Sequence, residues 1–335
     1  MESKMYRTGI IGMGGMGKAH FKTLRTMENV NLVAIASVSV DNAISYVNQQ
    51  GLSCRVYEDS FEMIEKEMLD ILYVCLPPYA HSGQIEAAAA KGVHIFNEKP
   101  IALTIERAKS INKAVNDAGV YSQVGYQMRF GGAVQKLKEL IENGTAGTPT
   151  LFTARYECNS LHSPWWCDKS KSGGQVFEQV IHLYDLAMHF MGLPKIVCGF
   201  IANLQHNNIP GYTVEDTSVA SICFENGSLA NISGSNCSVP GQWRGMFRVI
   251  CKNLVADFDD CNNATITYTN EKEIRTEILS YNYDLRLLEN EYFIDVVRGN
   301  KPPFATMNEG LYGLLMVDSV IKSSSKFGAP INVEY

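Results

Sequence analysis

The chain has 335 residues, of which 46% are hydrophobic and 19% are charged, and its formal net charge is −6. This length is too great for one ordinary core and predicts two domains. The acidic balance, without any cluster of Lys and Arg, argues against nucleic acid as a partner. No apolar run has the length of a membrane span or the form of a signal peptide, so we expect a cytoplasmic protein without a membrane partner.

The nine cysteines are scattered and none forms a C-x-x-C pair. Scattered cysteines in an odd number fit reduced thiols in a cytoplasmic protein. His182 and His189, seven residues apart, could share one helix face, but they would form an incomplete ligand set. We therefore expect no metal ion.

Residues 1–125 alternate strand and helix patterns. In chain order we expect strand 7–11, helix 18–27, strand 31–38, helix 45–50, strand 56–57, helix 59–67, strand 71–76, helix 81–91, strand 93–96, helix 104–118 and strand 120–125. Such alternation predicts right-handed βαβ units and an α/β, doubly wound parallel sheet, here a Rossmann domain.

Residues 126–335 have a different pattern. We expect helix 133–143, strand 150–156, a helix in the second half of 173–191, strands 196–201, 216–224, 228–235, 246–252, 254–259 and 264–269, and helices near 284–298 and 308–326. Asn226-Gly227 between two of these strands is a strong hairpin signal. Strands without crossover helices predict an α+β domain with a large, mostly antiparallel open sheet.

A glycine-rich loop is the strongest local motif. Gly12, Gly14 and Gly17 match G-x-G-x-x-G between a strand and a helix, the context that dinucleotide binding requires. The first glycine allows a tight turn, the second a close approach of pyrophosphate, and the third helix–strand packing. The helix N-terminus then offers N–H groups to the phosphates. The alternative is a glycine-rich turn without a ligand.

The choice between NAD and NADP depends on the end of the second strand. NAD-specific sites usually carry a carboxylate there, roughly 20 residues after the glycines, to hold the ribose 2′-hydroxyl. That position is Ser37, so no carboxylate repels a 2′-phosphate, but no Arg follows to bind one. The sequence favours NADP weakly and leaves NAD open.

Two further motifs follow strands whose ends should face the ligand crevice of a doubly wound sheet. Pro77-Pro78 with His81 follows one strand, and Glu98-Lys99-Pro100 follows the next. Lys99 is well placed for a functional role there. The alternative is a surface salt bridge between Lys99 and Glu98.

Taken together, these motifs resemble the glucose–fructose oxidoreductase and inositol dehydrogenase family. The resemblance extends over nearly the whole chain, in the right order. Its residues are Gly12–Gly17 with His20, Pro77-Pro78 with His81, Glu98-Lys99-Pro100, Gly125–Phe130, Gly173-Gly174 with Glu178, His182 and Asp185, Asn226-Gly227, and Gly299–Pro302.

The resemblance implies an NAD(P)-dependent oxidoreductase of sugars, inositols or related polyols. It implies that Lys99 orients substrate and assists proton transfer, that Glu98 lies near the nicotinamide ribose, and that His182 is the acid–base group. The expected cofactor-binding residues are Gly12, Met13, Gly14, Gly15, Met16, Gly17, Ser37, Pro77, His81, Glu98, Lys99 and Gln127. The expected substrate-binding residues are Lys99, Arg129, Trp165, Trp166, Glu178 and His182.

Glu178 and His182 are four residues apart, which on a helix places them on one face. A histidine with a pKa near about 6.5 can accept the hydroxyl proton at neutral pH. Dehydrogenases of this family usually carry Asp where this chain has Glu178. The alternative for His182 is a structural helix histidine. Trp165 and Trp166 could stack on a sugar ring, form a lid or contact another subunit.

The leading hypothesis is hydride transfer between nicotinamide and a secondary alcohol or ketone, with His182 as acid–base group and Lys99 as the oxygen-orienting group. The alternatives are an NAD-dependent glycosidase that oxidises its substrate transiently and a non-catalytic sugar or dinucleotide sensor. Relatives often pair through the open sheet of the second domain, so we expect a homodimer or homotetramer.

Overall fold

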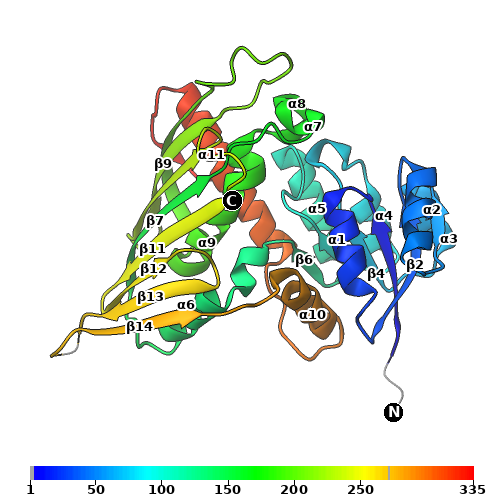
Figure 1. Ribbon diagram of the computed structural model, residues 1–335, viewed down its shortest axis with the longest axis horizontal. Helices are drawn as coiled ribbons and strands as arrows, with labels where there is room; N and C mark the ends of the chain where they lie inside the picture. Colours follow the sequence, from blue (N-terminus) through cyan, green and yellow to red (C-terminus); the bar gives the residue numbers. More distant parts are fainter. Residues whose placement is uncertain (1–3, 271) are drawn as a thin grey trace. The chain divides into compact units, whose positions relative to one another are not determined.

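The computed structural model describes residues 4–270 and 272–335 (Figure 1). It divides into two compact units. The first comprises the chain up to Gly125 together with Arg286–Leu311, and the second comprises Tyr126–Leu285 and Tyr312–Tyr335. Residues 286–311, which the sequence analysis assigned to the C-terminal domain, thus belong to the first unit. Among the described residues, no helix combines the length and apolar content needed to cross a bilayer.

The first unit contains the expected Rossmann sheet. Its six strands are all parallel and lie in the order β3-β2-β1-β4-β5-β6. The strands are β1 (Tyr6–Ile11), β2 (Val30–Ala36), β3 (Arg55–Tyr57), β4 (Ile71–Val74), β5 (His94–Asn97) and β6 (Ser122–Val124). The helices are α1 (Gly15–Leu24), α2 (Val40–Gln49), α3 (Ser60–Lys66), α4 (Gln84–Ala90), α5 (Ile105–Ala118) and α10 (Leu285–Val297).

Helix α10 completes the core of this unit. Phe293 is fully buried and meets the rings of Tyr73 on β4 and Phe96 on β5, with centroids 6.2 and 5.7 Å away. Gln123 on β6 donates from Nε2 to the Glu289 carbonyl at 2.9 Å. These contacts explain why a segment late in the chain belongs to the N-terminal unit.

The second unit is built on a nine-stranded sheet in the order β14-β13-β12-β11-β7-β10-β9-β8-β15. Among these neighbours, β7 and β10 are parallel and the others antiparallel, as expected of a mostly antiparallel sheet. The strands are β7 (Pro149–Glu157), β8 (Pro194–Ala202), β9 (Thr217–Phe224), β10 (Leu229–Ser235), β11 (Arg244–Cys251), β12 (Leu254–Phe258), β13 (Asn263–Tyr268), β14 (Arg275–Ser280) and β15 (Ile331–Asn332).

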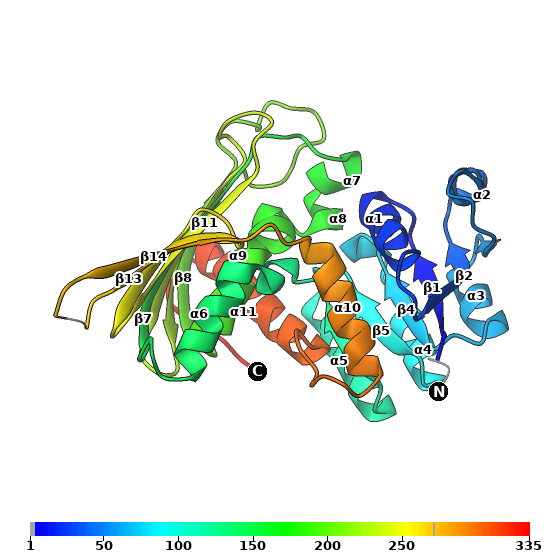
Figure 2. The ribbon, with the colours of Figure 1, turned by 60° about the horizontal axis from the view of Figure 1, so that its bottom comes forward.

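Helices cover one face of this sheet. Helix α9 (Ile181–Met191) packs on β7 and β10, and α6 (Gly132–Glu142) packs near β13 and β14 (Figure 2). Helix α11 (Met307–Ser325) reaches β8, where the Ser323 hydroxyl accepts a hydrogen bond from Gly199 N at 2.9 Å. The opposite face of the sheet exposes Phe200, Val219 and Leu229.

Some expected elements differ from those observed. The helix expected over 81–91 begins only at Gln84, as α4, because Gly83 before it has a non-helical φ of +130°. A 3₁₀ turn at Pro78–Ala80 precedes it. The helix expected within 173–191 begins with a π-helical turn at Val176–Val180. Strands β14 and β15 were missed, since β14 is largely exposed and lacks a clear apolar alternation.

Candidate active site

The expected site residues fall into two sets, one in each unit. The first set follows the carboxyl ends of parallel strands: the glycine loop follows β1, Ser37 follows β2, Pro77 lies just beyond β4, and Glu98 follows β5. Because parallel strands all end at one edge of the sheet, these residues gather there. The second set, which includes Gln127, Glu178 and His182, belongs to the second unit.

The glycine loop has the geometry that its motif predicts. Gly12 has φ +90°, and an added Cβ would lie 2.5 Å from the Cys75 carbonyl oxygen. A Cβ on Gly17 would lie 1.8 Å from the Gly12 carbonyl oxygen, so α1 can start close to β1 only with glycine there. A Cβ added to Gly14 or Gly15 would instead have no other atom within 4 Å. Two glycines thus close the turn and two leave room at the N-terminus of α1 for a phosphate.

Ser37 is half-buried and follows the last residue of β2. Its backbone N–H donates to the Tyr57 carbonyl at 2.9 Å, and its hydroxyl accepts from Ser39 N at 3.3 Å. The position that follows β2 therefore carries a hydroxyl and no charge. The first acidic residue after it is Asp41, in the first turn of α2.

His81 lies beyond Pro77 and the 3₁₀ turn, and its side chain is buried. Burial, with the positive charge of Arg107, lowers the pKa of His81 to about 4. The imidazole is consequently neutral at physiological pH and can act as a hydrogen-bonding group, not as a cation.

Glu98 is held by a chain of buried hydrogen bonds through His20 to Asn290. Its Oε1 lies 2.8 Å from Nε2 of His20, and its Oε2 accepts from the Lys99 backbone N–H at 3.2 Å. Nδ1 of His20 lies 3.1 Å from Oδ1 of Asn290 on α10. A Cβ on Gly125 would come within 2.8 Å of the Glu98 carboxylate, so glycine is required there as well. Glu98 is thus oriented toward His20, and Lys99 is half-buried beside it.

In the second unit, the Gly173-Gly174 pair shapes the start of the π-helical turn. Both glycines have positive φ, +82° and +112°. A Cβ on Gly174 would lie 2.5 Å from both carboxylate oxygens of Glu215, which accepts from Val176 N at 2.9 Å. The double glycine therefore allows Glu215 to cap this helical segment. π-Helical turns occur frequently at functional sites.

Glu178 lies on that π-helical turn. Its Oε2 accepts a hydrogen bond from the Trp166 indole N–H at 2.8 Å. Trp166 is buried among His162 and Tyr212, with ring centroids 4.0 and 6.2 Å away. The hydrogen bond from this enclosed indole orients the Glu178 carboxylate. Trp165 is half-buried beside Trp166 and presents a partly exposed ring.

His182 is in the first turn of α9, immediately after the π-helical turn. Its side chain is buried, and its ring approaches that of Tyr126 edge-on, with centroids 6.4 Å apart. The backbone changes from π-helical to α-helical geometry between Glu178 and His182. The two side chains are therefore not related by the regular α-helical spacing that places residues four apart on one face.

Arg129 was expected to contact substrate, and the structure shows how its side chain is held. Its side chain is buried, and it forms a two-pronged ion pair with Asp185: Nε to Oδ2 at 2.9 Å and Nη2 to Oδ1 at 2.6 Å. Paired guanidinium and carboxylate groups of this geometry are strong and directional. Arg129 thus links the turn at Gln127–Phe130 to α9.

Comparison with known proteins matches both parts of the chain. Residues 6–126 match the family model described as "Oxidoreductase family, NAD-binding Rossmann fold", and residues 134–255 match "GFO/IDH/MocA C-terminal domain". The chain belongs to the GFO/IDH/MocA oxidoreductase family. As a member, it is an NAD(P)-dependent enzyme of the dehydrogenase and reductase class that acts on CH–OH groups.

Two relatives named as inositol dehydrogenases match over almost their full length. Myo-inositol 2-dehydrogenase from Thermotoga maritima is 28% identical over 95% of this chain and 96% of its own. The scyllo-inositol 2-dehydrogenase (NAD(+)) from Bacillus subtilis is 25% identical over 98% of this chain and 96% of its own. The structure of levoglucosan dehydrogenase with NADH and levoglucosan shares the fold, with a TM-score of 0.89, 21% identity and coverage of 99% and 100%.

Several residues of this GFO/IDH/MocA member were not identified as site residues from sequence. His20 was named only as part of the family resemblance, with no role. Its partner Asn290 was missed because the two residues are 270 positions apart in the sequence. Glu215 and the hydrogen bond from Trp166 to Glu178 were also missed, although their partners lie only 39 and 12 residues away. The Gly173-Gly174 pair was the one sequence feature beside the position that Glu215 contacts.

Proposed function

We propose that this GFO/IDH/MocA member transfers a hydride between NAD(P) and a secondary alcohol of an inositol or a related sugar. The observation that carries the proposal is the near full-length match to two inositol 2-dehydrogenases. The open space at Gly14 and Gly15, next to the tight turns at Gly12 and Gly17, supports pyrophosphate binding at α1. Met13, Met16, Ser37, Pro77, His81, Glu98, Lys99 and Gln127 complete the proposed cofactor contacts.

The chemistry divides between bound cofactor and side chains. The nicotinamide, when bound, accepts or returns the hydride. His182 takes the hydroxyl proton in oxidation and returns it in reduction. Lys99 donates a hydrogen bond to the same oxygen and stabilises its developing negative charge. Trp165 contacts the sugar ring.

Glu178 acts with His182 as the second acid–base group of the site. The Trp166 N–H supports this role, because it orients one carboxylate oxygen of Glu178. The longer arm of Glu, relative to the Asp common in the family, shifts that carboxylate and changes which sugar hydroxyl it contacts.

We also propose that the exposed face of the nine-stranded sheet pairs with a second copy of the chain. Phe200 on β8 and Val219 on β9 are direct cross-strand partners, and both are about half exposed. Exposed apolar side chains gathered on one sheet face mark interaction surfaces. A homodimer, or a homotetramer built from two dimers, would cover them.

The deciding experiment is a nicotinamide absorbance assay with NAD and NADP over inositols, aldoses, ketoses and their reduced forms. We expect turnover with at least one of them, and the better cofactor will show how Ser37 determines the choice. Lys99→Met and His182→Asn should each lower kcat by about 10²–10⁴-fold while cofactor binding persists. A matched control is Lys109→Met, an exposed lysine of the same unit.

Turnover that survives both Lys99→Met and His182→Asn would contradict the assigned roles. Cofactor binding without net absorbance change on any substrate would favour the glycosidase with transient oxidation or the sensor.

A further inference from the structure

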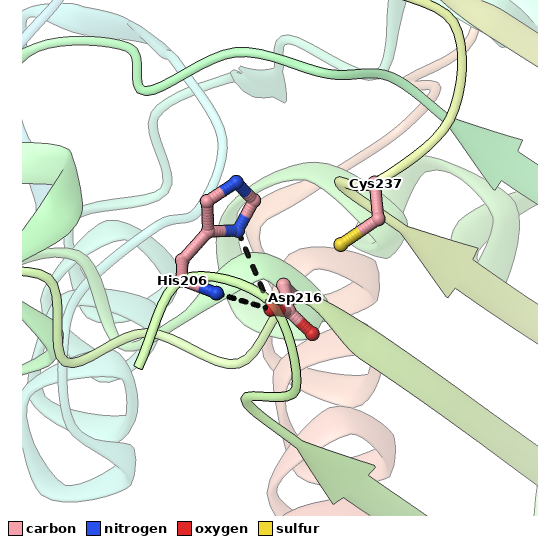
Figure 3. Close-up of side chains that lie close together, drawn as sticks. All are labelled: His206, Asp216 and Cys237. Carbon is pink, nitrogen blue, oxygen red and sulfur yellow. Dashed lines mark hydrogen bonds and ion pairs between the residues drawn. The ribbon is translucent and has the colours of Figure 1, made fainter. Parts of the chain in front are cut away.

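Three side chains of the second unit with metal-binding chemistry lie together, away from the residues assigned to the reaction. They are His206, Asp216 and Cys237, and one ligand atom from each lies within 4.8 Å of the other two (Figure 3). Figure 3 shows the imidazole and the thiol directed toward the carboxylate. They combine a nitrogen, an oxygen and a sulfur ligand.

The strand register brings these residues together. Strands β9 and β10 pair antiparallel, with Thr217 opposite Ser235 at the end of the ladder. Asp216 immediately precedes β9 and Cys237 follows β10 by two residues, so both emerge at the same edge. His206 enters from the loop of residues 203–216 that joins β8 to β9. Spacings of 10 and 21 residues match no common metal motif, which is why the sequence predicted no metal.

Backbone N–H groups hold the Asp216 carboxylate in place. Although its burial alone would raise its pKa, the N–H groups of Leu204, Gln205 and His206 hold the pKa of Asp216 below its ordinary value. All three donors reach Oδ2: Leu204 N at 3.0 Å, Gln205 N at 2.7 Å and His206 N at 3.1 Å. Oδ1 accepts from Leu204 N at 3.0 Å and from the Thr217 hydroxyl at 3.1 Å. Hydrogen bonds of this kind orient carboxylate ligands around metal ions.

We propose that His206, Asp216 and Cys237 bind one Zn²⁺ ion, with water as the fourth ligand. Nδ1 of His206 lies 3.3 Å from Oδ2 of Asp216. Two ligands about 2.0–2.1 Å from a tetrahedral zinc ion are separated by about 3.4 Å, so this edge of the site is already formed. Sγ of Cys237 lies within 4.8 Å of both of these atoms and would have to approach them to complete the site.

The ligand set selects the ion. A carboxylate and a thiolate carry two negative charges, which balance those of Zn²⁺, and the imidazole binds as a neutral ligand. Mg²⁺ and Ca²⁺ require oxygen ligands and would be disfavoured by sulfur and nitrogen. His206 and Cys237 are both half-buried, so an ion can reach them from solvent while Asp216 lies underneath.

Zinc at this position would order the 203–216 loop. The His206 ring lies against Tyr212, with centroids 4.8 Å apart, and Tyr212 packs in a small buried cluster with Trp166. Asn236, next to Cys237, donates from Nδ2 to the Tyr212 hydroxyl at 3.0 Å. The ion would thus stabilise the packing around Trp166, the residue that positions Glu178.

The test uses the full chain, treated with chelator and then titrated with Co²⁺ and Zn²⁺. Co²⁺ is a spectroscopic substitute for Zn²⁺, and tetrahedral coordination with a thiolate gives intense visible bands and a sulfur-to-cobalt charge-transfer band. We expect one Co²⁺ per chain with both features, displacement by one equivalent of Zn²⁺, and a higher unfolding temperature with Zn²⁺.

Two variants and one control make the test specific. Cys237→Ser should abolish the charge-transfer band, and His206→Asn should weaken Co²⁺ binding by at least about tenfold. Cys198→Ser, which changes another half-buried cysteine of the same unit, should leave the charge-transfer band and the Co²⁺ affinity unchanged. None of these readouts depends on the proposed dehydrogenase activity.

The proposal is overturned if the wild-type protein binds no Co²⁺ in tetrahedral form. It is also overturned if the charge-transfer band persists in a folded Cys237→Ser variant. In either case the three side chains form only a hydrogen-bonded cluster that fixes the loop. Burial, with the Asp216 carboxylate, raises the pKa of Cys237 to about 11, so that cluster would hold a protonated thiol.

Discussion

His20 and Glu98 form a buried hydrogen-bonded pair, with Nε2 of His20 2.8 Å from Oε1 of Glu98. Nδ2 of Asn290 donates to the Arg286 carbonyl, so Oδ1 of Asn290 faces His20, and Nδ1 of His20 must be the donor. Nε2, the other ring nitrogen of His20, faces the Glu98 carboxylate. Helix α10 therefore sets the hydrogen-bonding state of a residue in the Glu98-Lys99-Pro100 motif.

Removing His20 should destabilise the first unit. His20→Ala leaves Glu98 buried without this partner, and we expect a loss of about 3 kcal/mol in the free energy of unfolding. Glu98→Gln should cost less than about 1 kcal/mol, because its amide can donate to Nε2 and its oxygen can still accept from Lys99 N. Denaturant unfolding measures both. Equal losses in the two variants would show that the pairing described here is wrong.

The Trp166 N–H should matter for turnover because it orients Glu178. Trp166→Phe keeps an aromatic ring in the cluster but removes the donor, and a hydrogen bond to a charged group contributes about 1.5–3 kcal/mol. We expect kcat to fall by about tenfold or more with little change in the KM of the cofactor. Trp165→Phe, which removes no bond to Glu178, is the control. The same kcat in both variants would exclude the positioning role.

His81 should make the protein less stable in acid. Its folded-state pKa is lowered from 6.5 to about 4, so the unfolded chain binds a proton at higher pH than the folded chain does. Stability is therefore lost as pH falls from about 6.5 to about 4, by about 3 kcal/mol, and this contribution is constant below that range. His81→Gln should show a shallower loss over this window in pH-dependent unfolding. Parallel curves for the two proteins would contradict the assignment.

A charge on the open sheet face should separate the proposed subunits. Val219→Lys places an ammonium opposite Phe200, where it would be desolvated in a dimer. We expect sedimentation velocity to show a smaller species than the wild-type protein. Val239→Lys, at an exposed valine outside the strands, is the control and should leave the assembly intact. A monomeric wild-type protein would refute the proposed pairing.

Several parts of the site could be predicted locally. The glycine motif, the strand ends at Ser37 and Glu98, and the Asn226-Gly227 hairpin all depend on residues that are close in sequence, and the structure confirms their elements. Parallel strands end at one edge of a sheet, so strand order alone gathers the residues that follow them. The resemblance to the family rests in part on these same motifs, and the two family models that match residues 6–126 and 134–255 show the membership.

Other features depend on contacts between distant segments. The sequence by itself determined the alternation of strands and helices in the Rossmann unit, the glycine loop and the place of Lys99 after β5, because backbone conformation and apolar periodicity are local. Only the tertiary structure decided that α10 completes the first core, that Arg129 pairs with Asp185, and that His206, Asp216 and Cys237 meet. These outcomes follow from packing and strand register, which bring together side chains whose sequence separation carries no signal.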